Sequence, residues 1–125
     1  MIRKENRVQV EGLAGGKGPA TVCHILTKDE LMGHGRMYAK VILPPGSSLG
    51  FHQHVHETEP YYILSGVGDF TDNDGSVTKV TAGDCCLIEP GQSTALPITG
   101  PKTWYSWHSF ITTKTAMVYC RYRFS

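Results

Sequence analysis

At 125 residues the chain is long enough to form one domain with its own hydrophobic core, without disulfides or a structural metal. Its net charge of +1 and its lack of a Lys/Arg cluster argue against nucleic acid as the main partner. No apolar run reaches the length of a membrane span, so we expect no membrane partner. The N-terminal sequence lacks the apolar core of a signal peptide, which predicts a cytoplasmic protein with reduced cysteines.

Residues 1–20 are predicted to form an N-terminal arm and loop of a single domain that spans residues 1–125. An extended segment at residues 7–10 would add to the sheet of a second copy and cover an exposed edge, which predicts a homodimer. Residues 12–19, GLAGGKGP, lack the Lys-Ser/Thr ending of a phosphate loop and a following helix. We therefore expect a flexible linker or dimer-arm loop there.

One helical turn is predicted at residues 27–32, with Thr27 as its cap and Glu30 completing a capping box. Elsewhere the pattern is nearly all β, because short runs rich in Val, Ile, Tyr and Thr are separated by Gly, Pro, Asp or Asn clusters. Residues 72–75, Asp-Asn-Asp-Gly, are typical of a hairpin turn. Strands are predicted at residues 21–26, 36–43, 51–56, 61–64, 67–71, 76–80, 85–88, 106–111 and 116–122.

Strand alternation sorts the side chains into an inner and an outer face. Residues 36–43 alternate cleanly, which is typical of a strand with one face buried. In the strand that follows the histidines, an inward Glu59 implies an inward Tyr61. The adjacent Cys85 and Cys86 would point to opposite faces, so they make a poor metal pair, and we interpret both as small buried side chains.

The segment 46–66, GSSLGFHQHVHETEPYYILSG, carries more chemical information than the rest of the chain. His52, His54 and His56 occupy alternate positions, so a strand would turn all of them to one face. Glu59 follows shortly after the last histidine. Two neutral imidazoles and one carboxylate that converge on a point make a ready first coordination shell for a divalent metal ion.

The spacing of this segment resembles the first motif of the cupins. Every position of that motif is filled, by Gly46, His52, His54, Glu59 and Gly66. The resemblance implies an all-β fold, a cupin-type jelly-roll β-barrel with one short helical turn. It also implies a divalent metal ion as cofactor, and the donor set admits Fe, Mn, Ni or Zn.

A second cupin motif is expected at residues 83–112, and it departs from the family pattern at one position. Gly83 opens it and Pro90 and Gly91 follow, but Thr94 stands where the family has a histidine ligand. Either the fourth ligand has been lost or an insertion has carried it downstream. Without a fourth ligand, the remaining set resembles the two-histidine, one-carboxylate arrangement of non-haem iron oxygenases.

We prefer the insertion, because residues 107–112 resemble the usual continuation of the motif and make His108 the fourth ligand. The residues that remain after His108 suffice for one hairpin and a closing strand. The inserted segment, at about residues 92–105, would form a lid or binding loop at the barrel mouth, with Thr94 on that loop. The predicted metal ligands are then His52, His54, Glu59 and His108.

A metal ion held by these ligands keeps coordination positions free for water or substrate. It can therefore polarise a carbonyl or carboxylate, or activate dioxygen. No separate base is evident, and the candidate catalytic residues are Tyr61, His56 and Glu57. Trp104 and Tyr105 would either form an aromatic binding wall or pack in the core. We expect a metal-dependent enzyme (a dioxygenase, isomerase or lyase) that acts on a small oxygenated or carboxylate compound in the barrel. The alternative is a non-catalytic metal-dependent small-molecule binding or sensor module.

Overall fold

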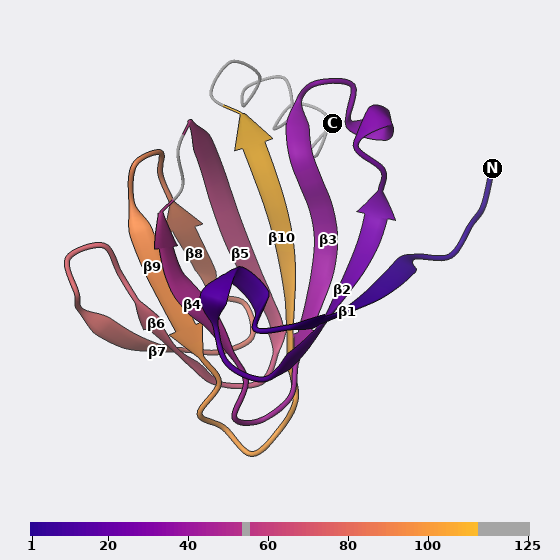
Figure 1. Cartoon of the computed structure of the whole chain (residues 1–125). Helices are drawn as coiled ribbons and strands as arrows, with labels where there is room; N and C mark the ends of the chain where they lie inside the picture. The colour runs from indigo at the N-terminus through magenta and orange to yellow at the C-terminus, as the bar shows by residue number, and fades with distance from the viewer. Residues whose placement is uncertain (54–55, 113–125) are drawn as a thin grey trace.

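The structure is a computed structural model that describes residues 1–53 and 56–112; residues 54–55 and 113–125 lie outside this description (Figure 1). Short strands joined by tight turns make up almost all of the described chain, and two 3-10 turns are its helical elements. The 3-10 turns are η1 (Leu13–Gly15) and η2 (Asp29–Leu31). The strands are β1 (Asn6–Glu11), β2 (Pro19–Leu26), β3 (Gly35–Leu43), β4 (Ser48–Gln53), β5 (Glu57–Ser65), β6 (Gly68–Thr71), β7 (Val77–Val80), β8 (Cys85–Ile88), β9 (Ser93–Pro97) and β10 (Trp104–Thr112).

The strands form two antiparallel sheets that pack face to face (Figure 1). The larger sheet has the order β1-β2-β3-β10-β5-β8, and the smaller one has the order β4-β9-β6-β7. The two strands of the histidine-rich segment, β4 and β5, therefore belong to opposite sheets. This architecture confirms the predicted all-β, cupin-type jelly roll. None of the helical turns described here is long and apolar enough to cross a membrane.

The hydrophobic core fills the space between the two sheets. Leu43 on β3, Ile63 on β5 and Leu96 on β9 are all fully buried and belong to one cluster. Trp104, at the start of β10, is 0 % exposed and sits in the same cluster, so it packs in the core as one of the two interpretations expected. Tyr105 next to it is exposed on the outer face.

Most of the predicted elements are present within a few residues of their expected bounds. The capping box is confirmed, because the Thr27 backbone N–H donates to Glu30 Oε1 at 2.8 Å and the Glu30 N–H donates to Thr27 Oγ1 at 3.2 Å. Residues 72–75 join β6 to β7 as a tight turn, with the Gly75 N–H donating to the Asp72 carbonyl at 2.9 Å. The strand predicted at residues 116–122 lies outside the described residues.

Residues 7–10 of the N-terminal arm lie in β1, which pairs along its whole length with β2 of its own chain, with Val8 opposite Val22. Pairing with β2 satisfies the β1 backbone on that side. β1 is also the edge strand of the larger sheet, and its addition to the sheet of a second copy stays a prediction.

Residues 12–19 are also not a free linker. The Ser48 N–H donates to the Lys17 carbonyl at 2.8 Å, and the Lys17 N–H donates to Ser48 Oγ at 3.0 Å. The backbone of this turn lies so close to β4 that a Cβ placed on Gly16 would come within 2.0 Å of the Ser48 carbonyl oxygen. The glycines therefore allow close packing of backbone on backbone, a use of glycine that composition alone does not separate from flexibility.

Candidate functional site

The carboxylate of the first motif lies in the interior of the fold. Along β5 the side chains of Glu59, Tyr61 and Ile63 are buried, and those of Tyr62 and Leu64, which follow Tyr61 and Ile63, are exposed. Glu59 is 1 % exposed, and it is the one charged side chain among the described residues that is fully buried. A buried carboxylate needs hydrogen bonds or a nearby cation to keep its charge.

Tyr61 supplies one such hydrogen bond. Burial first, and then the Glu59 carboxylate through its charge and a hydrogen bond, raise the pKa of the Tyr61 phenol well above its ordinary value. The phenol therefore stays protonated and orients the carboxylate. Its candidate catalytic role stays a prediction.

The position of Thr94 corrects the predicted insertion loop. Residues 93–97 form β9, whose side chains alternate, and Thr94 and Leu96 are 0 % exposed. Thr94 is the Cα partner of His52 on β4, so it lies in the smaller sheet on the inner face and not on a mouth loop. The loop prediction was wrong because the prolines and glycines near residues 97–101 end the strand instead of marking the whole segment as irregular.

His108 lies on β10, as expected. Its Cα partners are Ala39 on β3 and Tyr61 on β5, and both of these are buried. Two residues earlier on the same strand, Ser106 is 0 % exposed. The His108 side chain is not among those described, so its role as the fourth ligand stays a prediction.

The histidines of the first motif are described only in part. His52 lies on β4, but its side chain is not described, and His54 lies outside the described residues. His56 is exposed and has a φ of 60°, and β4 ends at Gln53. The prediction of one strand over residues 51–56 is therefore too long, and His56 leaves the alternation that would have placed it on the face of His52.

Glu57, one of the three candidate catalytic residues, is held in an ion pair. Arg36 Nε donates to Glu57 Oε2 at 2.7 Å and Arg36 Nη2 donates to Oε1 at 3.0 Å. This fork-to-fork geometry is among the stronger forms of the interaction. The pKa of Arg36 is raised chiefly by Glu57, and the charge of Glu59 adds to the effect. No sequence pattern indicated this pair, because Arg36 lies on β3 and Glu57 on β5, and these two strands do not pair directly.

The described side chains alone do not complete a metal site, since no three His, Cys, Asp or Glu among them gather into a metal-binding group. Of the four predicted ligands, Glu59 is the one whose side chain is described. The other donors would be imidazoles, and such a mixed set suits a divalent transition metal. Cys85 is exposed and Cys86 is buried, so they face opposite ways as predicted, but the interpretation of both as buried is wrong for Cys85.

Residues 39–120 match the family model of the Cupin domain. The chain is a member of the cupin family. It is 41 % identical over 92 residues to the oxalate-binding protein of Thermotoga maritima, a match that covers 74 % of this chain and 75 % of that protein.

Two solved structures show the same fold. The crystal structure of a predicted oxalate decarboxylase from Thermotoga maritima superposes with a TM-score of 0.84 at 35 % identity, over 90 % of this cupin and 98 % of that chain. A conserved protein with a double-stranded β-helix domain from Klebsiella pneumoniae has a TM-score of 0.64 at 18 % identity, over 91 % of this chain and 85 % of the other. The second likeness shows the fold alone.

Proposed function

We propose that this cupin binds a divalent metal ion in its interior and uses it to hold a small carboxylate compound, with oxalate or a close analogue as the ligand. The observation that carries the proposal is the buried Glu59 carboxylate on the inner face of β5, opposite the sheet that contains His52. The names of the two Thermotoga maritima relatives, an oxalate-binding protein and a predicted oxalate decarboxylase, support a ligand of this class.

The residues would divide the work as follows. Glu59 and the imidazoles of His52 and His54 would hold the ion, and His108 would add a fourth donor from β10. A metal bound there would supply a Lewis acid with open positions for the two oxygens of a carboxylate. Tyr61 would keep the Glu59 carboxylate in one orientation, as partners of metal ligands commonly do.

Binding without turnover is the function that the described residues favour. Two of the three candidate catalytic groups are poorly placed for proton transfer in the interior, because Glu57 is paired with Arg36 and His56 is exposed. The second candidate is a metal-dependent enzyme, such as a lyase that splits the carbon–carbon bond of oxalate. The extensive likeness to the predicted oxalate decarboxylase favours it.

One set of measurements tests both candidates. The protein is freed of metal and reloaded with Mn²⁺, Zn²⁺, Ni²⁺ or Fe²⁺, and oxalate binding is followed by calorimetry while formate and carbon dioxide are assayed. We expect oxalate to bind only to loaded protein and no product to form; turnover would favour the enzyme. Glu59→Gln should lose the metal, and the exposed Glu89→Gln is the matched control. Full metal content in Glu59→Gln would refute the site.

We also propose that the protein forms a homodimer. Four large apolar side chains are exposed on the outer face of β5, β8 and β10, with exposed fractions between 37 % and 51 %: Tyr62, Leu64, Leu87 and Tyr105. Apolar residues that gather on one face are typical of an interaction surface. The proposed compartment stays the cytoplasm, with Cys23, Cys85 and Cys86 as free thiols.

A further inference from the structure

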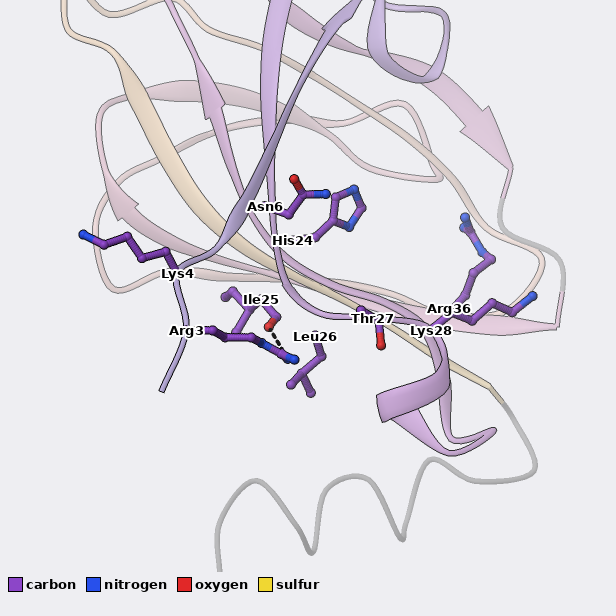
Figure 2. Close-up of a pocket in the computed structure, with 9 residues that line it drawn as sticks. All are labelled: Arg3, Lys4, Asn6, His24, Ile25, Leu26, Thr27, Lys28 and Arg36. Carbon is purple, nitrogen blue, oxygen red and sulfur yellow. Dashed lines mark hydrogen bonds between the residues drawn. The ribbon is translucent and has the colours of Figure 1, made fainter. Parts of the chain in front are cut away.

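A second cavity lies where β1 begins, β2 ends and β3 begins, and none of its lining residues is a proposed metal ligand (Figure 2). Its volume is about 370 Å³. Sites for small molecules have volumes of about 300–1,000 Å³. The cavity is therefore large enough for a small metabolite.

The lining is rich in cations. Arg3, Lys4, Lys28 and Arg36 all border the cavity, and none of the acidic residues that the structure describes does. Arg3 is paired with Glu30 and Arg36 with Glu57, so their charges are largely balanced. Lys4 and Lys28 have no ion-pair partner among the described residues. The neighbouring Glu5 does not balance Lys4, because it pairs with Arg7 and Lys40; Asp29, next to Lys28, is exposed and forms no ion pair within the described part of the chain.

Cationic side chains lie at both ends of the cavity. Figure 2 shows Lys4 at one end and Lys28 beside Arg36 at the other, with the ammonium groups of both lysines pointing outward and the polar ends of His24 and Asn6 between them. Ile25 and Leu26 add apolar surface. A lysine has a flexible stem, so each ammonium group can turn over the rim toward a ligand. A ligand that uses both lysines has a negative group at each end and a short body that can contact both polar and apolar atoms.

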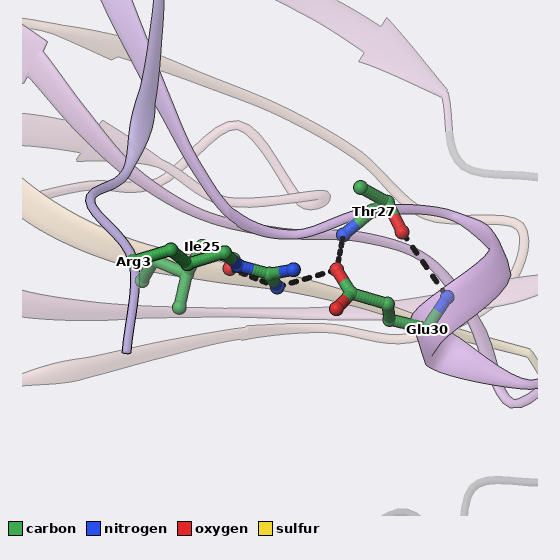
Figure 3. A network of polar contacts seen from close by, with 4 residues as sticks. All are labelled: Arg3, Ile25, Thr27 and Glu30. Atoms are coloured by element: carbon green, nitrogen blue, oxygen red, sulfur yellow. Dashed lines mark hydrogen bonds and ion pairs between the residues drawn. The ribbon is translucent and has the colours of Figure 1, made fainter. Parts of the chain in front are cut away.

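The wall of the cavity is fixed by a polar network, so the arrangement does not depend on a loose N-terminus. Arg3 donates to the Glu30 carboxylate and to the Ile25 carbonyl, the second at 3.2 Å, and Glu30 in turn accepts from the Thr27 N–H (Figure 3). The hydrogen bond from Arg3, followed by that from Thr27, lowers the pKa of Glu30 to about 2. The carboxylate is therefore charged at neutral pH and holds the arm against η2.

We propose that this cavity is a second binding site, for a small organic anion that carries a negative group at each end. The negative groups are carboxylates or phosphates, which share the chemistry that Lys and Arg recognise. The site does not need the metal, because the proposed ligands lie elsewhere in the chain.

The test uses ¹⁵N-labelled Glu59→Gln protein, in which the proposed metal centre is removed, so that failure of one site does not hide the other. Adipate, a dicarboxylate, and inorganic pyrophosphate are titrated separately and followed through the amide signals. We expect saturable shifts at Asn6, His24 and Thr27 with at least one of them, and the better probe identifies the negative group.

Matched double variants test the role of charge. Lys4→Gln with Lys28→Gln should weaken binding about tenfold. Lys17→Gln with Lys102→Gln removes the same charge from exposed positions outside the cavity and should leave the affinity unchanged. Amide spectra without ligand check that each variant is folded. The proposal is overturned if neither probe shifts these amides at millimolar concentration, or if both double variants bind equally.

Discussion

Replacing Tyr61 by Phe tests whether the phenol orients the buried carboxylate. The substitution keeps the aromatic ring, and therefore the edge-on contact with Phe70, whose ring centroid lies 6.5 Å away at an interplanar angle of 86°. It removes only the hydroxyl, which is hydrogen-bonded to Glu59. The effect can then be assigned to the loss of polar contacts, not to a cavity.

The size of the effect follows from burial. Tyr61 and Glu59 are each 1 % exposed, so water does not replace the lost donor. Removing one partner of a buried hydrogen bond to a charged group costs about 1.5–3 kcal/mol. In the metal-free protein the free energy of unfolding should fall by that amount, and metal affinity should fall about 10–100-fold, as when other partners of metal ligands are removed.

Chemical denaturation of metal-free protein and a competition assay with a metal chelator measure the two quantities. The control is Tyr105→Phe, which removes a hydroxyl from a side chain that is 37 % exposed. That change should stay within about 0.5 kcal/mol. If Tyr61→Phe matches this control in both unfolding free energy and metal affinity, the phenol does not support Glu59 and the reasoning fails.

Three further predictions concern the fourth ligand, the dimer and the arm. His108→Ala should weaken metal binding measured by chelator competition, whereas Thr94→Ala should leave it unchanged; the reverse result would place the fourth donor on β9. Leu87→Glu should convert dimer to monomer in sedimentation, and a wild-type monomer at micromolar concentration would refute the interface. Because the pKa of Glu30 in the folded protein lies at about 2, below its ordinary value of 4.5, its contribution to stability is complete above pH 4.5 and is lost as the pH falls toward 2. The protection of the Thr27 amide hydrogen, measured as its exchange rate relative to an unstructured peptide at the same pH, should therefore fall over that interval, and constant protection would contradict the proposed role of Arg3.

The fold was largely predictable because its signals are local. Alternation and turn residues placed β2, β3 and β8 within two residues, and the Thr27–Glu30 capping pair was evident from its spacing alone. The missed strands have weaker signals. In β9 the alternation of buried and exposed residues is short and ends in Pro97. β1 consists mostly of exposed polar residues. Neither sequence therefore shows the pattern of a strand with one buried face.

The site was predictable in its residue types but not in its partners. The spacing of the first motif predicted Glu59 as a site residue, and its side chain is buried. Nothing in the sequence indicated that Arg36 would form an ion pair with Glu57. That pair depends on how far two strands in one sheet are shifted relative to each other, which single-sequence patterns do not encode. The pairing of His52 with Thr94 could not be predicted from the sequence for the same reason.

The turn at residues 12–18 has a consequence for any attempt to shorten this protein. The family match begins at residue 39, which invites removal of everything before it. Yet a Cβ on Gly50 would lie 2.4 Å from the Ala14 carbonyl oxygen, so the turn covers the backbone of β4 directly, two residues before His52. A truncated chain would expose that backbone to water and leave β4 held from one side only. Affinity tags and fusion partners should therefore be added before residue 1 and should not replace the first segment. Residues 12–18 pack against β4, the strand that carries the first histidine.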